Sequence, residues 1–237
     1  MTKKIAIFGD SWGCSSFVKL PNFQEKLSDL TFQKLFPSDR YTVSNHSIRG
    51  GTNLEIINAV NTHHKDNDLL IIFQTDPIRQ YFVDYLSQEG WKINESIPLP
   101  DATNFEEFCE LTLKDFYDKL AEVDTPILLI GGSSKLCHKY VPSKIKTFPK
   151  SWTEFIVPEF TDSYCYWIEP SLAVYNYARK KLKWNSTLAD FSKFEDEIKQ
   201  KNYTWQTHDA FAWCHAADPA YHKMFDKIME VLENDYS

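Results

Sequence analysis

Apolar runs and helical periodicities alternate along the first half of the chain. Short apolar runs typical of strands buried on both faces are Lys4–Phe8, Leu69–Phe73 and Pro126–Ile130, and Tyr41–Ile48 is a fourth strand candidate. Apolar residues recur at helical spacing in Gln24–Phe36, Asn53–His64, Pro77–Leu86 and Asn104–Glu122. This alternation predicts a three-layer α/β/α sandwich around a parallel, doubly wound sheet of about five strands.

The second half of the chain is less regular. Residues 133–168 are polar, aromatic and interrupted by proline, a pattern typical of functional loops and lids. We therefore expect a single domain over residues 1–237 with a lid-like insertion around 133–168. Helical periodicity returns in Ser171–Leu182, in Thr187–Lys199 and in a last helix that starts at Asp218 as N-cap and Pro219 in the first turn.

Composition narrows the class of protein. The 237 residues suffice for one ample core, and 43% of them are hydrophobic. A net charge of −7 lacks the positive field of a general nucleic-acid binder, so no nucleic-acid partner is expected. The 5 cysteines are scattered and form no CxxC pair, which indicates reduced thiols without a zinc site. With no signal sequence and no run of about 18–20 apolar residues, we expect a cytoplasmic protein without a membrane span.

The strongest chemical signal follows the first strand candidate. Gly9-Asp10-Ser11 comes directly after Lys4–Phe8 and leads toward a helix. A serine just past the carboxyl end of a parallel strand lies where open α/β sheets bind their ligands. Backbone N–H groups at the start of the helix would face a developing oxyanion there. A lone Gly-Asp-Ser tripeptide is typical of an ordinary turn, but its position directly after the first strand favours a catalytic serine.

Two further segments extend this motif to a family pattern. NHSIRGGT (residues 45–52) follows the second strand candidate, and HAADPAY (residues 215–221) leads into the last helix. In this order, with IFGDSWG near the start, the segments resemble the SGNH (GDSL-type) hydrolase family. The first block is a close match and the second, NxSIxGxT, is a good one, whereas the third and fourth are degraded. The resemblance implies an SGNH-hydrolase fold, which is flavodoxin-like, and a serine ester hydrolase.

The resemblance also implies roles for the matching residues. Ser11 is the implied nucleophile and His215 the implied base. The backbone N–H groups of Gly50 and Ser11 would form the oxyanion hole, and Asp10, from the same block as Ser11, is a candidate substrate-binding residue. No cofactor is implied. The other histidines lack metal-ligand spacing, so no metal is expected either.

The third block of the family, Gly-x-Asn-Asp, is altered in this chain. Aligned on the third strand, Asp76 falls where the family's oxyanion-hole asparagine should be. An ionised carboxylate repels an oxyanion, whereas an amide N–H stabilises it. Arg79, three residues on at helical spacing, is placed to neutralise Asp76. A shift by one residue would put Thr75 at this position instead, and Gln74 could supply an amide by another route.

The fourth block, Asp-x-x-His, is altered as well. The residue three before His215 is Ala212 rather than an aspartate. Asp209, six before His215, is the candidate triad acid, and a backbone carbonyl that orients the ring in a Ser–His dyad is the alternative. Asp218 has helix capping as its expected role. A different register of the block would promote His222 to the base.

Two classes of function follow from these residues. The leading hypothesis is a serine hydrolase of SGNH type that acts on a small-molecule or carbohydrate ester, as an esterase, acylhydrolase or carbohydrate O-deacetylase. The second is a non-catalytic SGNH fold that binds a carbohydrate or a protein partner, because a fold does not fix a function. Group transfer to an acceptor other than water would use the same residues. Ser11, Gly50 and His215 in family order favour chemistry over binding.

Overall fold

A five-stranded parallel sheet forms the centre of the computed structural model. The structure describes residues 2–19, 25–75, 77, 102–132, 136–152, 155, 211–212 and 215–235. The sheet consists, in spatial order, of β4 (Tyr41–Asn45), β1 (Lys3–Phe8), β5 (Leu69–Gln74), β6 (Ile127–Gly131) and β7 (Lys146–Thr147). Every neighbouring pair is parallel. Counted along the chain, the order is 2-1-3-4-5, which is doubly wound.

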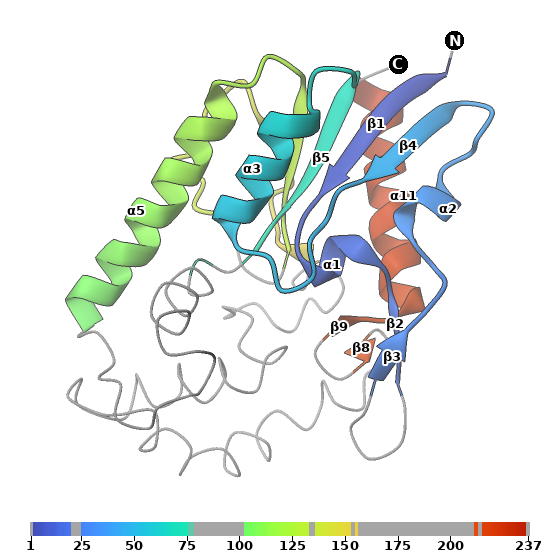
Figure 1. The fold of residues 1–237 in the computed structure, drawn as a ribbon, viewed down its shortest axis with the longest axis horizontal. Helices are drawn as coiled ribbons and strands as arrows, with labels where there is room; N and C mark the ends of the chain where they lie inside the picture. Colours follow the sequence, from blue (N-terminus) through green and yellow to red (C-terminus); the bar gives the residue numbers. More distant parts are fainter. Residues whose placement is uncertain are drawn as a thin grey trace.

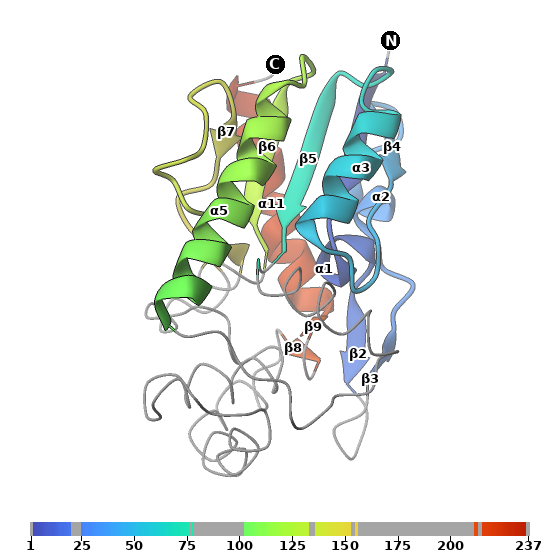
Figure 2. The ribbon, with the colours of Figure 1, turned by 60° about the vertical axis from the view of Figure 1, so that its left-hand side comes forward.

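Helices cover both faces of this sheet (Figure 1). On one face lie α3 (Asn53–His63) and α5 (Ala102–Ala121), and on the other lie α2 (Phe32–Leu35) and α11 (Asp218–Asp235). Figure 2 shows the sheet between α5 and α3 in front and α11 behind. The three-layer α/β/α sandwich with five parallel strands that the sequence predicted is therefore confirmed.

The two cores explain why the strands read as continuous apolar runs. In β1, Ile5 and Ile7 belong to the core shared with α11, whereas Ala6 and Phe8 belong to the core shared with α3 and α5. Successive side chains of a strand point to opposite faces, so a strand covered on both sides needs apolar residues at every position. In β5, the five residues Leu69–Phe73 are apolar and buried for the same reason.

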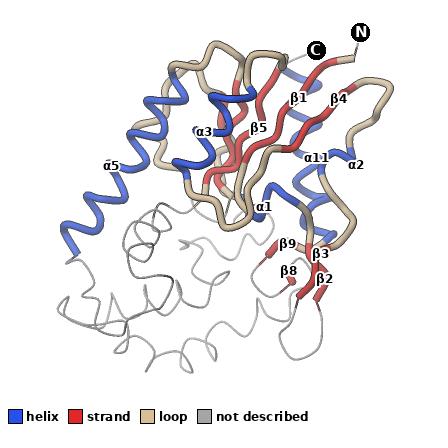
Figure 3. Tube along the Cα trace, in the orientation of Figure 1, coloured by secondary structure: helices blue, strands red, loops and turns tan. Residues whose placement is uncertain are grey.

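Small elements gather at the carboxyl end of the strands (Figure 3). They are α1 (Ser11–Cys14), β2 (Phe17–Lys19), β3 (Glu25–Leu27), β8 (Phe211–Ala212) and β9 (His215–Ala216). The strands β2 and β3 form an antiparallel ribbon, as do β8 and β9. These elements carry the two ends of the sequence pattern, around residues 11 and 215, to the same edge of the sheet.

One predicted helix is wrong. Gln24–Phe36 was expected to form a continuous helix, but its described part contains β3, a turn and the short helix α2. The hydroxyl of Ser28 accepts a hydrogen bond from the Leu30 N–H at 3.2 Å, a local bond that competes with helix formation. Pairing of β3 with β2 and full burial of Phe32 complete the alternative. Helical spacing of apolar residues therefore arose here from a turn that sends single side chains into the core.

The strand expected over Tyr41–Ile48 ends as β4 at Asn45. Its path along β1 continues, because His46 N–H donates to Ile7 O and Ile48 N–H donates to Gly9 O, each at 2.8 Å. The chain after β4 therefore stays beside the residues that precede Ser11.

The described part of the expected insertion contributes to the core. Within residues 136–152, β7 is the edge strand of the sheet, and Leu136, Ile145 and Trp152 are buried. The helices expected over Pro77–Leu86, Ser171–Leu182 and Thr187–Lys199 lie outside the described residues, apart from Pro77 itself.

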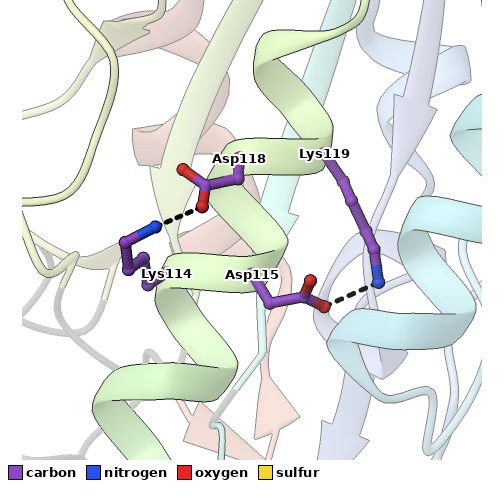
Figure 4. A network of polar contacts seen from close by, with 4 residues as sticks. All are labelled: Lys114, Asp115, Asp118 and Lys119. Atoms are coloured by element: carbon purple, nitrogen blue, oxygen red, sulfur yellow. Dashed lines mark hydrogen bonds and ion pairs between the residues drawn. The ribbon is translucent and has the colours of Figure 1, made fainter.

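The outer face of α5 carries ion pairs one helical turn apart (Figure 4). Lys114 pairs with Asp118, and Lys119 Nζ lies 2.6 Å from Asp115 Oδ2. All four side chains are exposed, so these pairs contribute little to the free energy of unfolding. Within the described residues, no helix is both long and apolar enough to cross a membrane.

Acid is expected to destabilise the fold through His46. Burial, and next the stacked His63 ring, lower the pKa of His46 from its ordinary value. The folded state therefore favours the neutral ring. This contribution to stability is complete above about pH 6.5 and is lost as the pH falls from there toward the lowered pKa. Urea unfolding at about pH 7.5 and 5.5 should show a smaller loss of stability in His46→Asn than in wild type. Equal losses in both proteins would contradict this prediction.

Candidate active site

Ser11 and His215 meet at the carboxyl end of the sheet. Ser11 is the first residue of α1, directly after β1, and His215 lies in β9, 204 residues further along the chain. Nε2 of His215 lies 2.9 Å from Oγ of Ser11. At this distance a neutral imidazole is placed to accept the hydroxyl proton. Ser11 is 3% exposed, so the contact is largely shielded from solvent.

Asp10 fixes the turn that presents Ser11. It is the N-cap of α1, and its Oδ1 accepts a hydrogen bond from Trp12 N–H at 2.9 Å. Its Oδ2 accepts a second bond from Thr75 Oγ1 at 2.8 Å. Gly9 precedes this turn, where a Cβ atom would lie 2.9 Å from Phe73 Cβ, so only glycine fits without a shift. The buried carboxylate of Asp10 thus joins the end of β1 to the end of β5.

Asn53 fixes the end of β5 in turn. Its Nδ2 donates to Thr75 O at 3.0 Å, and its Oδ1 accepts from Thr75 N–H at 3.1 Å. Asn53 is placed by the start of α3, where Thr52 and Glu55 form a capping box. Thr75 therefore uses its N–H, its C=O and its hydroxyl on Asn53 and Asp10. These contacts tie the ends of β1 and β5 to the start of α3.

The loop before α3 brings Gly50 to the same edge. Ile48 is bonded to Gly9, and Gly51 N–H donates to Ile48 O, which closes a turn over Gly50. The φ angle of Gly50 is +67°, a left-handed conformation that favours glycine. Two backbone donors, the Ser11 N–H at the start of α1 and the Gly50 N–H in the loop before α3, have no hydrogen-bond acceptor within the described part of the chain.

Helix α11 also anchors α1. The Tyr221 hydroxyl donates a hydrogen bond to Trp12 O, next to Ser11. Burial raises the pKa of Tyr221 well above its ordinary value, so the phenol stays protonated and keeps donating. Trp12 packs edge-on against Trp152, with ring centroids 5.1 Å apart. The nucleophile candidate is thus held between the sheet and α11.

Phe17 of β2 and the preceding residue, Ser16, hold the segment that carries His215. Phe17 forms a parallel bridge with Ala217, and Ser16 Oγ donates to Asp218 Oδ1. Asp218 was predicted to be the N-cap of the last helix. It is instead the first helical residue, and its carboxylate accepts from Ser16. This bond fixes the entry into α11 just after His215.

The Cys14 thiol, also on α1, is held in its protonated form. Burial, and next the nearby carboxylate of Asp10, raise the pKa of the Cys14 thiol to about 11. The thiol is therefore protonated at neutral pH, and the thiolate is the reactive form of cysteine. Within the part of the chain that the structure describes, no three His, Cys, Asp or Glu side chains gather as a metal site requires.

Some residues singled out in the sequence lie outside the described residues, and some residues of this site were missed. Asp76, Arg79 and Asp209 belong to the first group. Asn53 and Phe17, whose ring lies against His215, belong to the second. Neither belongs to a recognisable sequence motif, because each contacts a residue in a different element of the fold.

Comparison with known proteins gives matches among solved structures alone, since no family model and no curated protein matches the sequence. The chain is similar to a lipase/acylhydrolase from Enterococcus faecalis, at 12% sequence identity and a TM-score of 0.45, over 98% of this chain and 96% of that one. It is also similar to Axe2, an acetylxylan esterase from Geobacillus stearothermophilus, at 12% identity and a TM-score of 0.41, over 96% of this chain and 93% of that one. The fold class rests on the strand order and layers described above.

Removal of the Asn53 amide is expected to destabilise the protein. Asn53→Ala leaves the buried N–H and C=O of Thr75 without partners, at a cost of about 1–3 kcal/mol for each group. The free energy of unfolding in urea measures this loss. Asn58→Ala, on the exposed face of the same helix, is the matched control and should change stability by about 0.5 kcal/mol or less. Equal effects of the two substitutions would show that the Asn53 bonds contribute nothing.

Proposed function

We propose that this protein is a serine hydrolase of SGNH type that cleaves a small-molecule or carbohydrate ester. The observation that carries the proposal is the 2.9 Å contact between Ser11 Oγ and His215 Nε2. A serine hydroxyl becomes a useful nucleophile when a base removes its proton during attack. The order of the sequence blocks supports the same assignment.

The reaction proceeds through an acyl-enzyme. Ser11 Oγ attacks the ester carbonyl carbon while its proton passes to Nε2 of His215, and the π electron pair moves to the carbonyl oxygen. The pair then returns, the bond to the alcohol oxygen breaks, and that oxygen takes the proton from His215. Water next attacks the acyl group in the same way, with His215 again as base. The products are the alcohol and the carboxylic acid, and Ser11 regains its proton.

The N–H groups of Ser11 and Gly50 are proposed to stabilise the oxyanion. Both lack an acceptor among the described residues, and backbone donors aimed at developing charge lower the barrier. Thr75 is not a donor in this proposal, because its hydroxyl and N–H are bonded to Asp10 and Asn53. Asp76, directly after Thr75, is proposed to stand in place of the family's oxyanion-hole asparagine. Arg79 is proposed to neutralise its charge.

His215 requires a partner that holds its ring in the reactive orientation. Asp209, six residues earlier, is the candidate acid for this role. The stacking of the ring on Phe17 supports the orientation independently of that acid. The proposal therefore has two residues for the proton transfer, two backbone donors for the oxyanion, and a separate set that positions them.

Labelling with a fluorophosphonate probe tests this function. The probe should form an adduct on Ser11, because its phosphorus takes the place of the carbonyl carbon. Ser11→Ala should abolish the adduct, and His215→Ala should lower hydrolysis of a nitrophenyl acetate by about 10³-fold or more. Mass spectrometry of the labelled peptide and initial rates are the measurements.

Two matched variants control for unfolding. Ser15→Ala removes another buried hydroxyl just after α1, and His222→Gln changes an exposed histidine on α11. Both should keep the Ser11 adduct and the wild-type rate within about twofold. If wild-type protein formed no adduct at high probe concentration, the fold would serve binding rather than hydrolysis.

A further inference from the structure

Phe17 lies flat against the ring of His215. The two ring centroids are 4.0 Å apart and the planes differ by 17°. Phe17 is 7% exposed, so water has little access to the Phe17 ring. The imidazole edge that bears Nε2 points to Ser11 Oγ at the same time. The hydrogen bond uses the edge of the ring and the stacking uses its face, so both contacts coexist.

Backbone contacts hold Phe17 in this place. It pairs with Leu27 in the β2–β3 ribbon, and it bridges to Ala217, two residues after His215. Ser16, the residue before it, is bonded to Asp218. Figure 1 shows the β2–β3 ribbon beside β8 and β9 at the end of the sheet. Contacts with the β2–β3 ribbon and with the residues after His215 therefore hold Phe17 against the imidazole.

We propose that Phe17 is a positioning residue that acts through His215 and stabilises the positive charge of its ring during the reaction. This inference rests on the proposed function. When Ser11 Oγ bonds to the carbonyl carbon, the electron pair of the Oγ–H bond forms the new bond and the proton goes to Nε2. The carbonyl π pair moves to oxygen, and the imidazole becomes a cation.

The aromatic face of Phe17 favours that cation. The face of a benzene ring carries negative charge density, and it attracts a cation within about 6 Å of the ring centroid. The attraction is larger for the imidazolium than for the neutral ring, so it acts on the transition state more than on the bound substrate. The expected consequence is a contribution to kcat with little effect on KM.

Stepwise fluorination of Phe17 tests this charge effect. Replacement by 4-fluoro-, 3,5-difluoro- and 3,4,5-trifluorophenylalanine keeps the size of the ring close to that of phenylalanine and withdraws charge from its face. The kcat for a nitrophenyl acetate should fall with each fluorine, by about 3- to 30-fold in total, while KM stays unchanged. Phe17→Tyr should keep most of the rate, and Phe17→Leu should lose at least as much as the trifluoro variant.

The same series at Phe36 is the control. Phe36 is also buried, and its ring meets Tyr41 and Phe225 edge-on in the core under α11. Fluorination there should leave kcat unchanged. A flat series at Phe17, or an equal decline at Phe36, in an enzyme that is active and labelled at Ser11 would overturn this inference alone. A wild-type protein that neither hydrolyses the ester nor accepts the probe would overturn the proposed function and this inference with it.

Discussion

The rest of the site depends on the two hydrogen bonds that the buried carboxylate of Asp10 accepts. It accepts hydrogen bonds from Trp12 N–H at the start of α1 and from Thr75 Oγ1 at the end of β5. A buried carboxylate is costly unless such bonds satisfy it. They form when β1 and β5 lie side by side and α1 begins at Ser11. Assembly of the central strands and placement of the Ser11 hydroxyl are therefore coupled.

The same carboxylate shapes the chemistry of its neighbours. After burial itself, its charge is the main local influence that raises the pKa of Cys14, and it adds to the rise for Tyr221. Both groups are kept in their protonated forms. The thiol is then unreactive, and the phenol remains a donor to Trp12 O. Of these groups at α1, the Ser11 hydroxyl is the one that contacts the imidazole of His215.

The sequence predicted what depends on local pattern and missed what depends on distant partners. The strands Lys4–Phe8 and Leu69–Phe73 were found because a covered parallel strand must be apolar throughout. Gln24–Phe36 was assigned to a helix because pairing of Glu25–Leu27 with Phe17–Lys19 leaves no trace in its periodicity. Asn53 was missed because its side-chain amide binds the backbone at the end of β5, and in the sequence it looks like any polar residue at the start of a helix.

The positions of Ser11 and His215 follow from two separate sets of contacts. Ser11 is placed by the sheet, through Asp10 and the partners of Thr75, whereas His215 is placed by Phe17 and Asp218, through β2 and α11. The bond from Tyr221 to Trp12 joins the two sets directly behind Ser11. A shift of α11 along the sheet would therefore disturb both sets of contacts at once. The distance between Oγ and Nε2 is protected in this way, although 204 residues separate the two side chains.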